Sequence, residues 1–297
     1  MTSPPILILG GQSALGMHLR QLLPASTICY SRPPPISKNE VQIADYSDLP
    51  SEAMENTKVT INLIGAARGS VEELTYLNAE LPFQLAVKAK AAGVDQFIHI
   101  SSFSVFGSEQ NIARETLAVP ITAYGMTKKM GEDRLLALAD RDFKLSILRL
   151  PMLYDLHSPS KLQQMIFLWK RLGFLPVPAK KVQRSMMHYM LAAQVVKYVC
   201  ENEIEGVHAA ADPVPFDFSQ ARQKILLEHP GRWRILALPF WIFYPLKLLR
   251  PDIYRSYCRF NVLSDNANLA VQAELDSRLY KDIRSIPSMT WPRNGLS

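Results

Sequence analysis

Residues 6–16, ILILGGQSALG, join a short apolar run to a set of closely spaced glycines. Four consecutive apolar residues, Ile6 to Leu9, are typical of a parallel strand that is buried on both faces. The N-terminus of a helix that follows a glycine turn binds phosphate groups through its free backbone N–H groups. This stretch therefore predicts a strand, a tight turn and a helix, with room for the pyrophosphate of a dinucleotide at the turn.

Short apolar runs alternate with helix-like segments through the first half of the chain. After the first strand, strands are predicted at 27–30, 41–43, 59–64, 97–100 and 146–150, and helices at 17–23, 80–92 and 124–139. Such alternation predicts an α/β fold with a doubly wound parallel sheet, the Rossmann fold, whose ligands bind beyond the carboxyl ends of the strands.

The composition is that of a folded globular protein, with 297 residues, 48% apolar and 20% charged. The net charge of +6 comes from scattered basic residues, so no nucleic-acid partner is expected, whereas a phosphorylated substrate and cofactor would suit the charge. The three cysteines lie far apart, which predicts neither a metal site nor a disulfide framework. The apolar run near the N-terminus is too short for a signal peptide, and we expect a cytoplasmic protein.

A serine, a tyrosine and a lysine are the candidate catalytic residues. Ser102 follows the strand at 97–100, and Tyr124 and Lys128 share one face of the predicted helix because they are four residues apart. A cation beside a phenol favours its ionised form, so Lys128 is expected to lower the pKa of Tyr124. Tyr124 would then move the proton of a substrate alcohol or ketone, and Ser102 would hydrogen-bond the same oxygen.

These residues lie in the motifs SSxxVFG (101–107) and YxxxK (124–128), which resemble the active site of the extended short-chain dehydrogenase/reductases, the NAD(P)-dependent nucleotide-sugar epimerase/dehydratase family. The resemblance extends to about Ala211. It implies hydride transfer at a sugar carbon, usually C4, with Ser102, Tyr124 and Lys128 as the catalytic residues. It also implies a homodimer that pairs through the helices at 80–92 and 124–139.

The same resemblance divides the chain. It implies a dinucleotide-binding domain at 1–155 and a smaller substrate-binding part at 156–297, with segments near 182–210 returning to the main sheet. Prolines and aromatic residues become frequent after Pro151, where an isolated helix is predicted at 162–172.

The cofactor site follows from the family's GxxGxxG turn. Gly10 and Gly16 match its outer glycines, and Ser13 stands at the middle position. Ser31 and Arg32 stand where NAD enzymes carry an acidic residue and suit a 2′-phosphate, so NADP(H) is favoured over NAD(H). The remaining residues expected at the cofactor are Gln12, Ala14, Leu15, Asp45, Leu63, Ile64, Gly65, Asn78, Tyr124, Lys128, Leu150 and Pro151; Asn78 could equally be a helix N-cap.

The expected substrate-binding residues are Ser102, Ser104, His157 and Arg184. Arg184, in QRSMMHYMLAA (183–193), matches the family's arginine that meets the nucleotide diphosphate. A structural role is the main alternative for His157. Because Phe103 and Ser104 stand where dehydratases carry an Asp-Glu pair, dehydration is not expected, and keto reduction or epimerisation remains.

Two other functions stay open: a non-catalytic NADP-binding regulatory or assembly protein of the same fold, and a reductase of an apolar alcohol or ketone. The apolar segment 233–249, WRILALPFWIFYPLKLL, would line the pocket of the latter. Prolines interrupt this segment, and its length is marginal for a bilayer span. We expect it to form a wall of the substrate part or a subunit contact, with contact to a membrane surface as the alternative.

Overall fold

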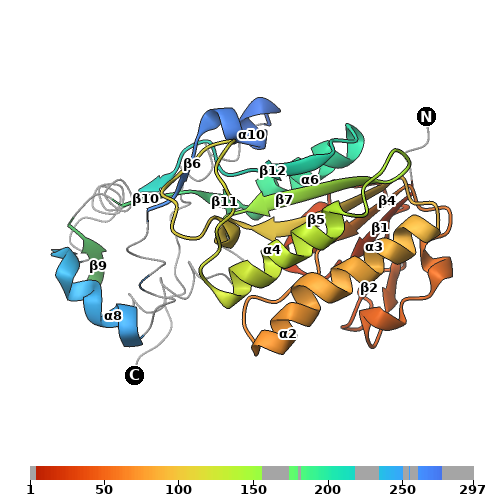
Figure 1. The fold of residues 1–297 in the computed structure, drawn as a ribbon, viewed down its shortest axis with the longest axis horizontal. Helices are drawn as coiled ribbons and strands as arrows, with labels where there is room; N and C mark the ends of the chain where they lie inside the picture. Colours follow the sequence, from red (N-terminus) through yellow and green to blue (C-terminus); the bar gives the residue numbers. More distant parts are fainter. Residues whose placement is uncertain are drawn as a thin grey trace, which may run out of the picture.

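The computed structural model describes residues 5–155, 174–179, 182–217, 234–249, 254 and 260–275 (Figure 1). At its centre lies a seven-stranded sheet in which every neighbouring pair of strands is parallel. The strand order across the sheet is β12 (Gly206–Ala209), β7 (Lys144–Leu150), β5 (Gln96–Ser102), β4 (Val59–Asn62), β1 (Ile6–Leu9), β2 (Ile28–Ser31) and β3 (Glu40–Gln42). The predicted parallel Rossmann sheet is confirmed.

The strand order reverses between β1 and β4. The chain moves outward from β1 to β2 and β3, and then returns to β4 on the other side of β1 and continues toward β12. Ligands of such sheets bind beyond the carboxyl ends of the strands at this switch point.

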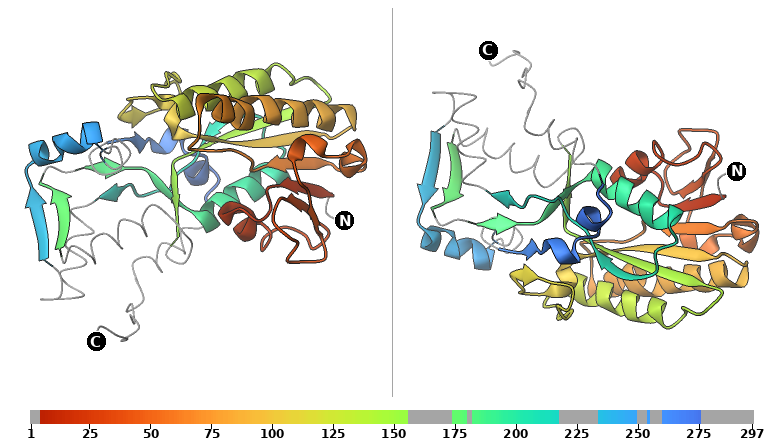
Figure 2. Two further views of the ribbon diagram at one scale, coloured as in Figure 1. Left: turned by 90° about the horizontal axis from the view of Figure 1, so that it is seen from below. Right: turned by 90° about the horizontal axis from the view of Figure 1, so that it is seen from above.

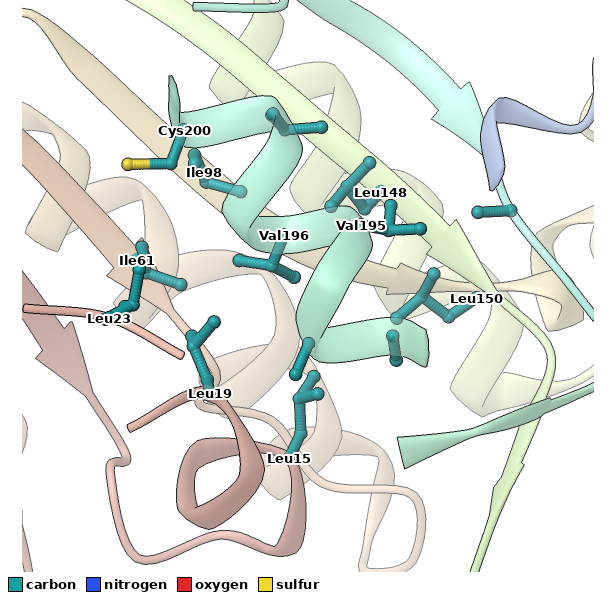
Figure 3. Close-up of a cluster of buried hydrophobic side chains, with 14 of the residues drawn as sticks. Leu15, Leu19, Leu23, Ile61, Ile98, Leu148, Leu150, Val195, Val196 and Cys200 are labelled. Atoms are coloured by element: carbon teal, nitrogen blue, oxygen red, sulfur yellow. The ribbon is translucent and has the colours of Figure 1, made fainter. Parts of the chain in front are cut away.

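Helices cover both faces of the sheet (Figure 2). One face carries α1 (Ala14–Leu19) and α6 (Tyr189–Glu201), and the opposite face carries α2 (Val71–Thr75), the π-helix η3 (Tyr76–Glu80), α3 (Leu81–Ala91) and α4 (Ala123–Leu136). Figure 3 shows the first face, where side chains of α1 and α6 pack against β4, β5 and β7. Those labelled are all buried, and each fully buried aliphatic side chain stabilises the fold by about 1.5–3 kcal/mol.

Two glycines let α4 approach its neighbours backbone to backbone. A Cβ atom at Gly131 would lie 2.2 Å from the carbonyl oxygen of Asn78 in η3, and one at Gly125 would lie 2.4 Å from the carbonyl oxygen of Ser104. Side chains at these positions would push the helix away. The helix that carries Tyr124 and Lys128 is therefore held tightly against η3 and the 3-10 turn η4 (Phe103–Phe106).

The remaining elements lie beyond the carboxyl ends of the main strands (Figure 1). They form four two-stranded sheets. These pair β10 (Gln183–Arg184) with β13 (Phe216–Asp217), β11 (Met186–His188) with β8 (Met152–Tyr154), β14 (Arg234–Leu238) with β9 (Phe174–Pro178), and β15 (Val262–Leu263) with β6 (Asn111–Ile112). The described residues of this part also form four short helical elements: η5 (Phe240–Phe243), α8 (Tyr244–Leu249), η6 (Asp265–Ala267) and α10 (Leu269–Gln272).

The helix predicted at 162–172 lies outside the described residues. Among the residues that are described, no helix combines the length and the apolar character needed to cross a membrane.

Candidate functional site

Ser102, Tyr124 and Lys128 lie together at the carboxyl end of β5. Ser102 is the last residue of that strand, and its Oγ accepts a hydrogen bond from the backbone N–H of Ser104 at 3.2 Å. Tyr124 and Lys128 lie in the first turns of α4, whose N-cap Thr122 accepts a hydrogen bond from the Gly125 N–H at 3.1 Å. The Ser102 hydroxyl lies close enough to the Tyr124 phenol to favour its ionised form, which brings the strand end and the helix together at this point.

The pKa of Tyr124 does not move in the predicted direction. Burial raises this pKa, and the hydrogen bond with Ser102 offsets only part of the rise. The Lys128 ammonium instead donates to the Ile100 carbonyl oxygen at 3.0 Å. The predicted net fall in this pKa is not seen in the structure, because burial of the phenol dominates.

Lys128 is itself strongly affected by burial. Its pKa falls from 10.5 to about 8 because the low-dielectric surroundings disfavour the ammonium, although Glu132 partly opposes this effect. Gly65, in the turn after β4, leaves space for the same group, since a Cβ atom at this position would lie only 2.8 Å from Lys128 Nζ. A buried amine close to its neutral form is typical of functional sites.

A buried carboxylate one helical turn after Lys128 ties α4 to the sheet. Glu132 accepts hydrogen bonds from Ser101 Oγ at 2.5 Å and from Arg149 Nη2 at 2.7 Å. The Arg149 guanidinium also lies 5.0 Å from the ring centroid of Phe106. Because Ser101 is on β5 and Arg149 on β7, this network fixes the position of the helix that carries Tyr124 and Lys128. The sequence reasoning missed Glu132, although its i+4 spacing from a candidate lysine was a usable signal.

The glycine turn between β1 and α1 is compact. Gly10 has a φ of 88°, which glycine adopts readily, and a Cβ atom at Gly16 would lie 2.5 Å from the Gly11 carbonyl oxygen. Ser13 is the N-cap of α1 and accepts a hydrogen bond from the Gly16 N–H at 3.1 Å. Gly11 was missed by the motif comparison, although a Cβ atom there would lie 2.7 Å from the Cβ of Cys29.

Ser31 supports this turn and does not face outward. It is 1% exposed, and its Oγ accepts a hydrogen bond from the Gln12 N–H at 3.1 Å. The prediction that Ser31 contacts a 2′-phosphate is corrected accordingly, because the side chain lies in the protein interior. Arg32, the next residue, is exposed.

Arg32 and Asp45 lie near each other in the loops after β2 and β3. The pKa of Asp45 is lowered mainly by hydrogen bonds from the backbone and hydroxyl of Ser47, with a smaller contribution from the charge of Arg32. Asp45 is exposed and caps the short helix η1 (Tyr46–Asp48).

The turn after β4 is held from both sides. Leu63 donates its N–H to the Leu9 carbonyl oxygen at 2.9 Å, and the Ile64 side chain is buried in the core. Asn78 is fully buried in η3; its Oδ1 accepts from the Ala66 N–H at 2.9 Å, and its Nδ2 donates to Thr127 Oγ1 at 3.1 Å. Its alternative assignment as a helix N-cap is therefore wrong, and it holds the Gly65 turn against α4.

The other predicted site residues belong to different elements. Leu150 pairs in register with Ser102 across β5 and β7, so it lies at the same sheet edge, and Pro151 follows it as a buried residue. Arg184 belongs to the separate sheet formed by β10 and β13. His157 lies outside the described residues.

The parallel sheet, the glycine turn after its first strand and the Ser102, Tyr124 and Lys128 group define an extended short-chain dehydrogenase/reductase. The family model described as the RmlD substrate binding domain matches residues 4–222, which is most of the chain. The chain belongs to this family.

Solved structures of similar fold include three of known description. A dTDP-4-dehydrorhamnose reductase from Clostridium acetobutylicum is 22% identical, with a TM-score of 0.62 over 80% of this chain and 85% of that one. MoeE5 in complex with UDP-glucose and NAD is 18% identical, with a TM-score of 0.66 over 91% and 97%. The human epimerase family protein SDR39U1 with NADPH is 15% identical, with a TM-score of 0.71 over 92% and 94%. At these identities the similarity establishes a common fold. A search of curated proteins found no match.

Proposed function

We propose that this protein is an NADP(H)-dependent reductase of a nucleotide sugar, acting on a ketone at a sugar carbon, C4 by preference. The observation that carries the proposal is the convergence of Ser102, Tyr124 and Lys128 at the carboxyl end of β5, beside the switch point of the sheet. Membership of a family that takes its name from a substrate binding domain supports an enzyme. The similar structures include a nucleotide-sugar reductase and proteins that hold UDP-glucose, NAD or NADPH.

The residues at the glycine turn fit a dinucleotide. Gly10, Gly11 and Gly16 have no side chains, and close contacts with the backbone or with Cys29 leave Gly11 and Gly16 no room for any. Ser13 accepts the Gly16 N–H and still has its own O–H to donate to a phosphate oxygen. Gln12, Ala14 and Leu15 complete this turn, and Asp45, Leu63, Ile64, Gly65, Leu150 and Pro151 line the path proposed for the rest of the cofactor. A bound nicotinamide would supply the hydride.

The raised pKa of Tyr124 is compatible with the proton donor that ketone reduction needs. Reduction of a ketone needs a phenol that is protonated at neutral pH, so that it can donate the proton as negative charge develops on the carbonyl oxygen. Epimerisation starts in the opposite sense, with removal of a proton from the sugar hydroxyl. Ser102 would donate a hydrogen bond to the same oxygen, and the Lys128 ammonium would hydrogen-bond the cofactor ribose and favour the developing charge.

Arg184 and Ser104 are proposed to contact the substrate. Arginine binds a diphosphate with two parallel hydrogen bonds, which suits the nucleotide part of the sugar. Ser102 Oγ donates a hydrogen bond to Ser104 Oγ at 3.2 Å, and reversal of this bond, with Ser104 as the donor, would free the Ser102 proton for the substrate oxygen.

The test is a direct assay of the purified full chain. The protein is mixed with NADPH or NADH and a nucleotide-linked 4-keto sugar, and absorbance of the reduced cofactor is followed together with the sugar product. We expect consumption of NADPH in equal amount to the ketone. Interconversion of two sugar epimers without net consumption would indicate an epimerase, and failure to bind any dinucleotide would contradict the proposal.

Cofactor choice gives a second expected result. Arg32→Ala should raise the KM for NADPH by about 10-fold or more and leave the KM for NADH nearly unchanged, because a lost charged hydrogen bond costs roughly 1.5–3 kcal/mol. The matched control is Arg141→Ala, which removes an exposed arginine from the turn before β7, at the opposite end of the strands. Equal losses with both cofactors would show that Arg32 does not recognise the 2′-phosphate.

A further inference from the structure

The segment 236–249 exposes an unusual set of large apolar side chains. Six of them stand in solvent, with exposed fractions of 46% for Leu236, 65% for Trp241, 38% for Ile242, 56% for Tyr244, 87% for Leu248 and 75% for Leu249. Single exposed apolar residues are ordinary, but a contiguous group marks an interaction surface. We call these six residues the apolar tip.

The apolar tip is a built part of the fold. It continues directly from β14, which pairs with β9 over five residues from Arg234↔Phe174 to Leu238↔Pro178. Within the segment, Phe243 is 4% exposed and turns inward. Figures 1 and 2 show β9 and α8 at the end of the molecule that lies away from the N-terminus and the main sheet. The tip therefore projects from the catalytic domain on an ordered support.

The stretch of sequence that contains the apolar tip has an excess of basic residues. Residues 230–250 contain no aspartate or glutamate and carry the basic residues Arg232, Arg234, Lys247 and Arg250. Exposed apolar and aromatic side chains in a stretch of sequence with a basic excess suit an anionic lipid surface, where Trp and Tyr lie at the headgroup level. Basic residues near such a surface add about 1 kcal/mol each.

The same charges disfavour a second copy of this chain as the occupant. A two-fold interface would bring the same patch of each copy together and oppose its basic residues to each other. Among the described residues, no helix is long and apolar enough to cross a bilayer.

We infer that the apolar tip docks the protein on the surface of an anionic lipid bilayer. Leu248 and Leu249 would enter the boundary between headgroups and acyl chains, with Trp241 and Tyr244 at headgroup depth. This inference does not depend on the proposed reaction, since it concerns a surface on separate elements.

Vesicle binding tests the inference on the full chain. Vesicles of phosphatidylcholine with about 30% phosphatidylglycerol are compared with pure phosphatidylcholine by flotation, at low salt and at high salt, where charges are screened. We expect at least ten-fold stronger partitioning to the anionic vesicles, weakened by salt. Absence of binding to both would overturn the inference.

The variants replace exposed residues, and the control matches the double glutamate substitution. Leu248→Glu with Leu249→Glu should lower partitioning at least ten-fold, and Trp241→Ala should lower it by a smaller factor, while dinucleotide binding and the melting temperature stay unchanged. The control, Val71→Glu with Leu117→Glu, adds the same charge at side chains that are 59% and 77% exposed elsewhere, and should bind vesicles as before. An equal loss in the control would contradict docking through the tip. So would self-association that the tip variant abolishes without any vesicle binding, since it would identify the face as a contact between copies.

Discussion

Tyr124→Phe is expected to lower kcat/KM for ketone reduction by about 10²–10⁴-fold, the range that a positioned general acid contributes. The variant keeps the ring and removes only the hydroxyl, which Ser102 hydrogen-bonds at the end of β5. Ser102 would still donate to the substrate oxygen, but no group would deliver the proton. Steady-state kinetics with NADPH and a nucleotide-linked 4-keto sugar measures the loss.

The fold and the cofactor site should survive this change. The partly buried phenol makes no contact that determines the turn at Gly10, so the Kd of NADPH should stay within about two-fold of the wild type. Tyr198→Phe, on α6 at the other face of the sheet, removes the same atom far from the site and should keep full activity. Normal turnover by Tyr124→Phe would remove the basis of the proposed mechanism.

The fold could be predicted from the sequence because parallel strands that are buried on both faces are apolar throughout. The first strand was predicted to the residue as Ile6–Leu9, and the other strands differ from the prediction by one or two residues at most of their ends. Helix α1 begins earlier than predicted, at Ala14, because the Ser13 side chain caps it. The start of a strand or a helix depends on residues that are neighbours in the sequence, so it can be predicted from them.

The parts that could not be predicted depend on segments far apart in the chain. Gly11 is required by the approach of Cys29, and Gly131 by the carbonyl oxygen of Asn78, and neither partner is near in sequence. Glu132 gains its role from Ser101 and Arg149 on two different strands. A sequence motif readily identifies the residues that face a ligand. It seldom identifies the residues that hold these ligand-facing residues in position.

Burial explains two of the predictions that differ from the structure, those on Tyr124 and Ser31. Whether Lys128 or the protein interior controls the pKa of Tyr124 depends on how deeply the phenol lies, which residue spacing does not reveal. Ser31 likewise has the right chemistry for a phosphate, but it points into the protein toward the Gln12 N–H.

Replacing Lys128 by Met should lower the activity of the protein and raise its stability. Lys128→Met is expected to lower kcat/KM by at least about 10²-fold, because the ammonium that would hold the ribose and favour the developing charge is lost. The free energy of unfolding at pH 7 should nevertheless rise. A pKa lowered from 10.5 to about 8 means that burial of the ammonium destabilises the fold by roughly 3 kcal/mol. The substitution removes this cost but also removes the hydrogen bond to the Ile100 carbonyl oxygen, which stabilises the fold by about 1 kcal/mol.

The pH dependence fixes the sign of this stability effect. Below about pH 8, Lys128 is protonated in both the folded and the unfolded chain, and the full cost of burying the charge is present. Between about 8 and 10.5 the unfolded chain binds a proton that the folded chain does not, so the stability contributed by this group rises with pH. Urea unfolding should therefore find Lys128→Met more stable than the wild type at pH 7, with the difference shrinking or reversing near pH 10.

The control is Lys129→Met, which replaces the adjacent lysine that forms an ion pair with Asp133. This variant should change the free energy of unfolding by less than about 0.5 kcal/mol at either pH. A Lys128→Met variant that is less stable than the wild type at pH 7 would mean that the ammonium is better solvated or paired in the fold than its burial implies, and the same measurement would remove the reason for its lowered pKa.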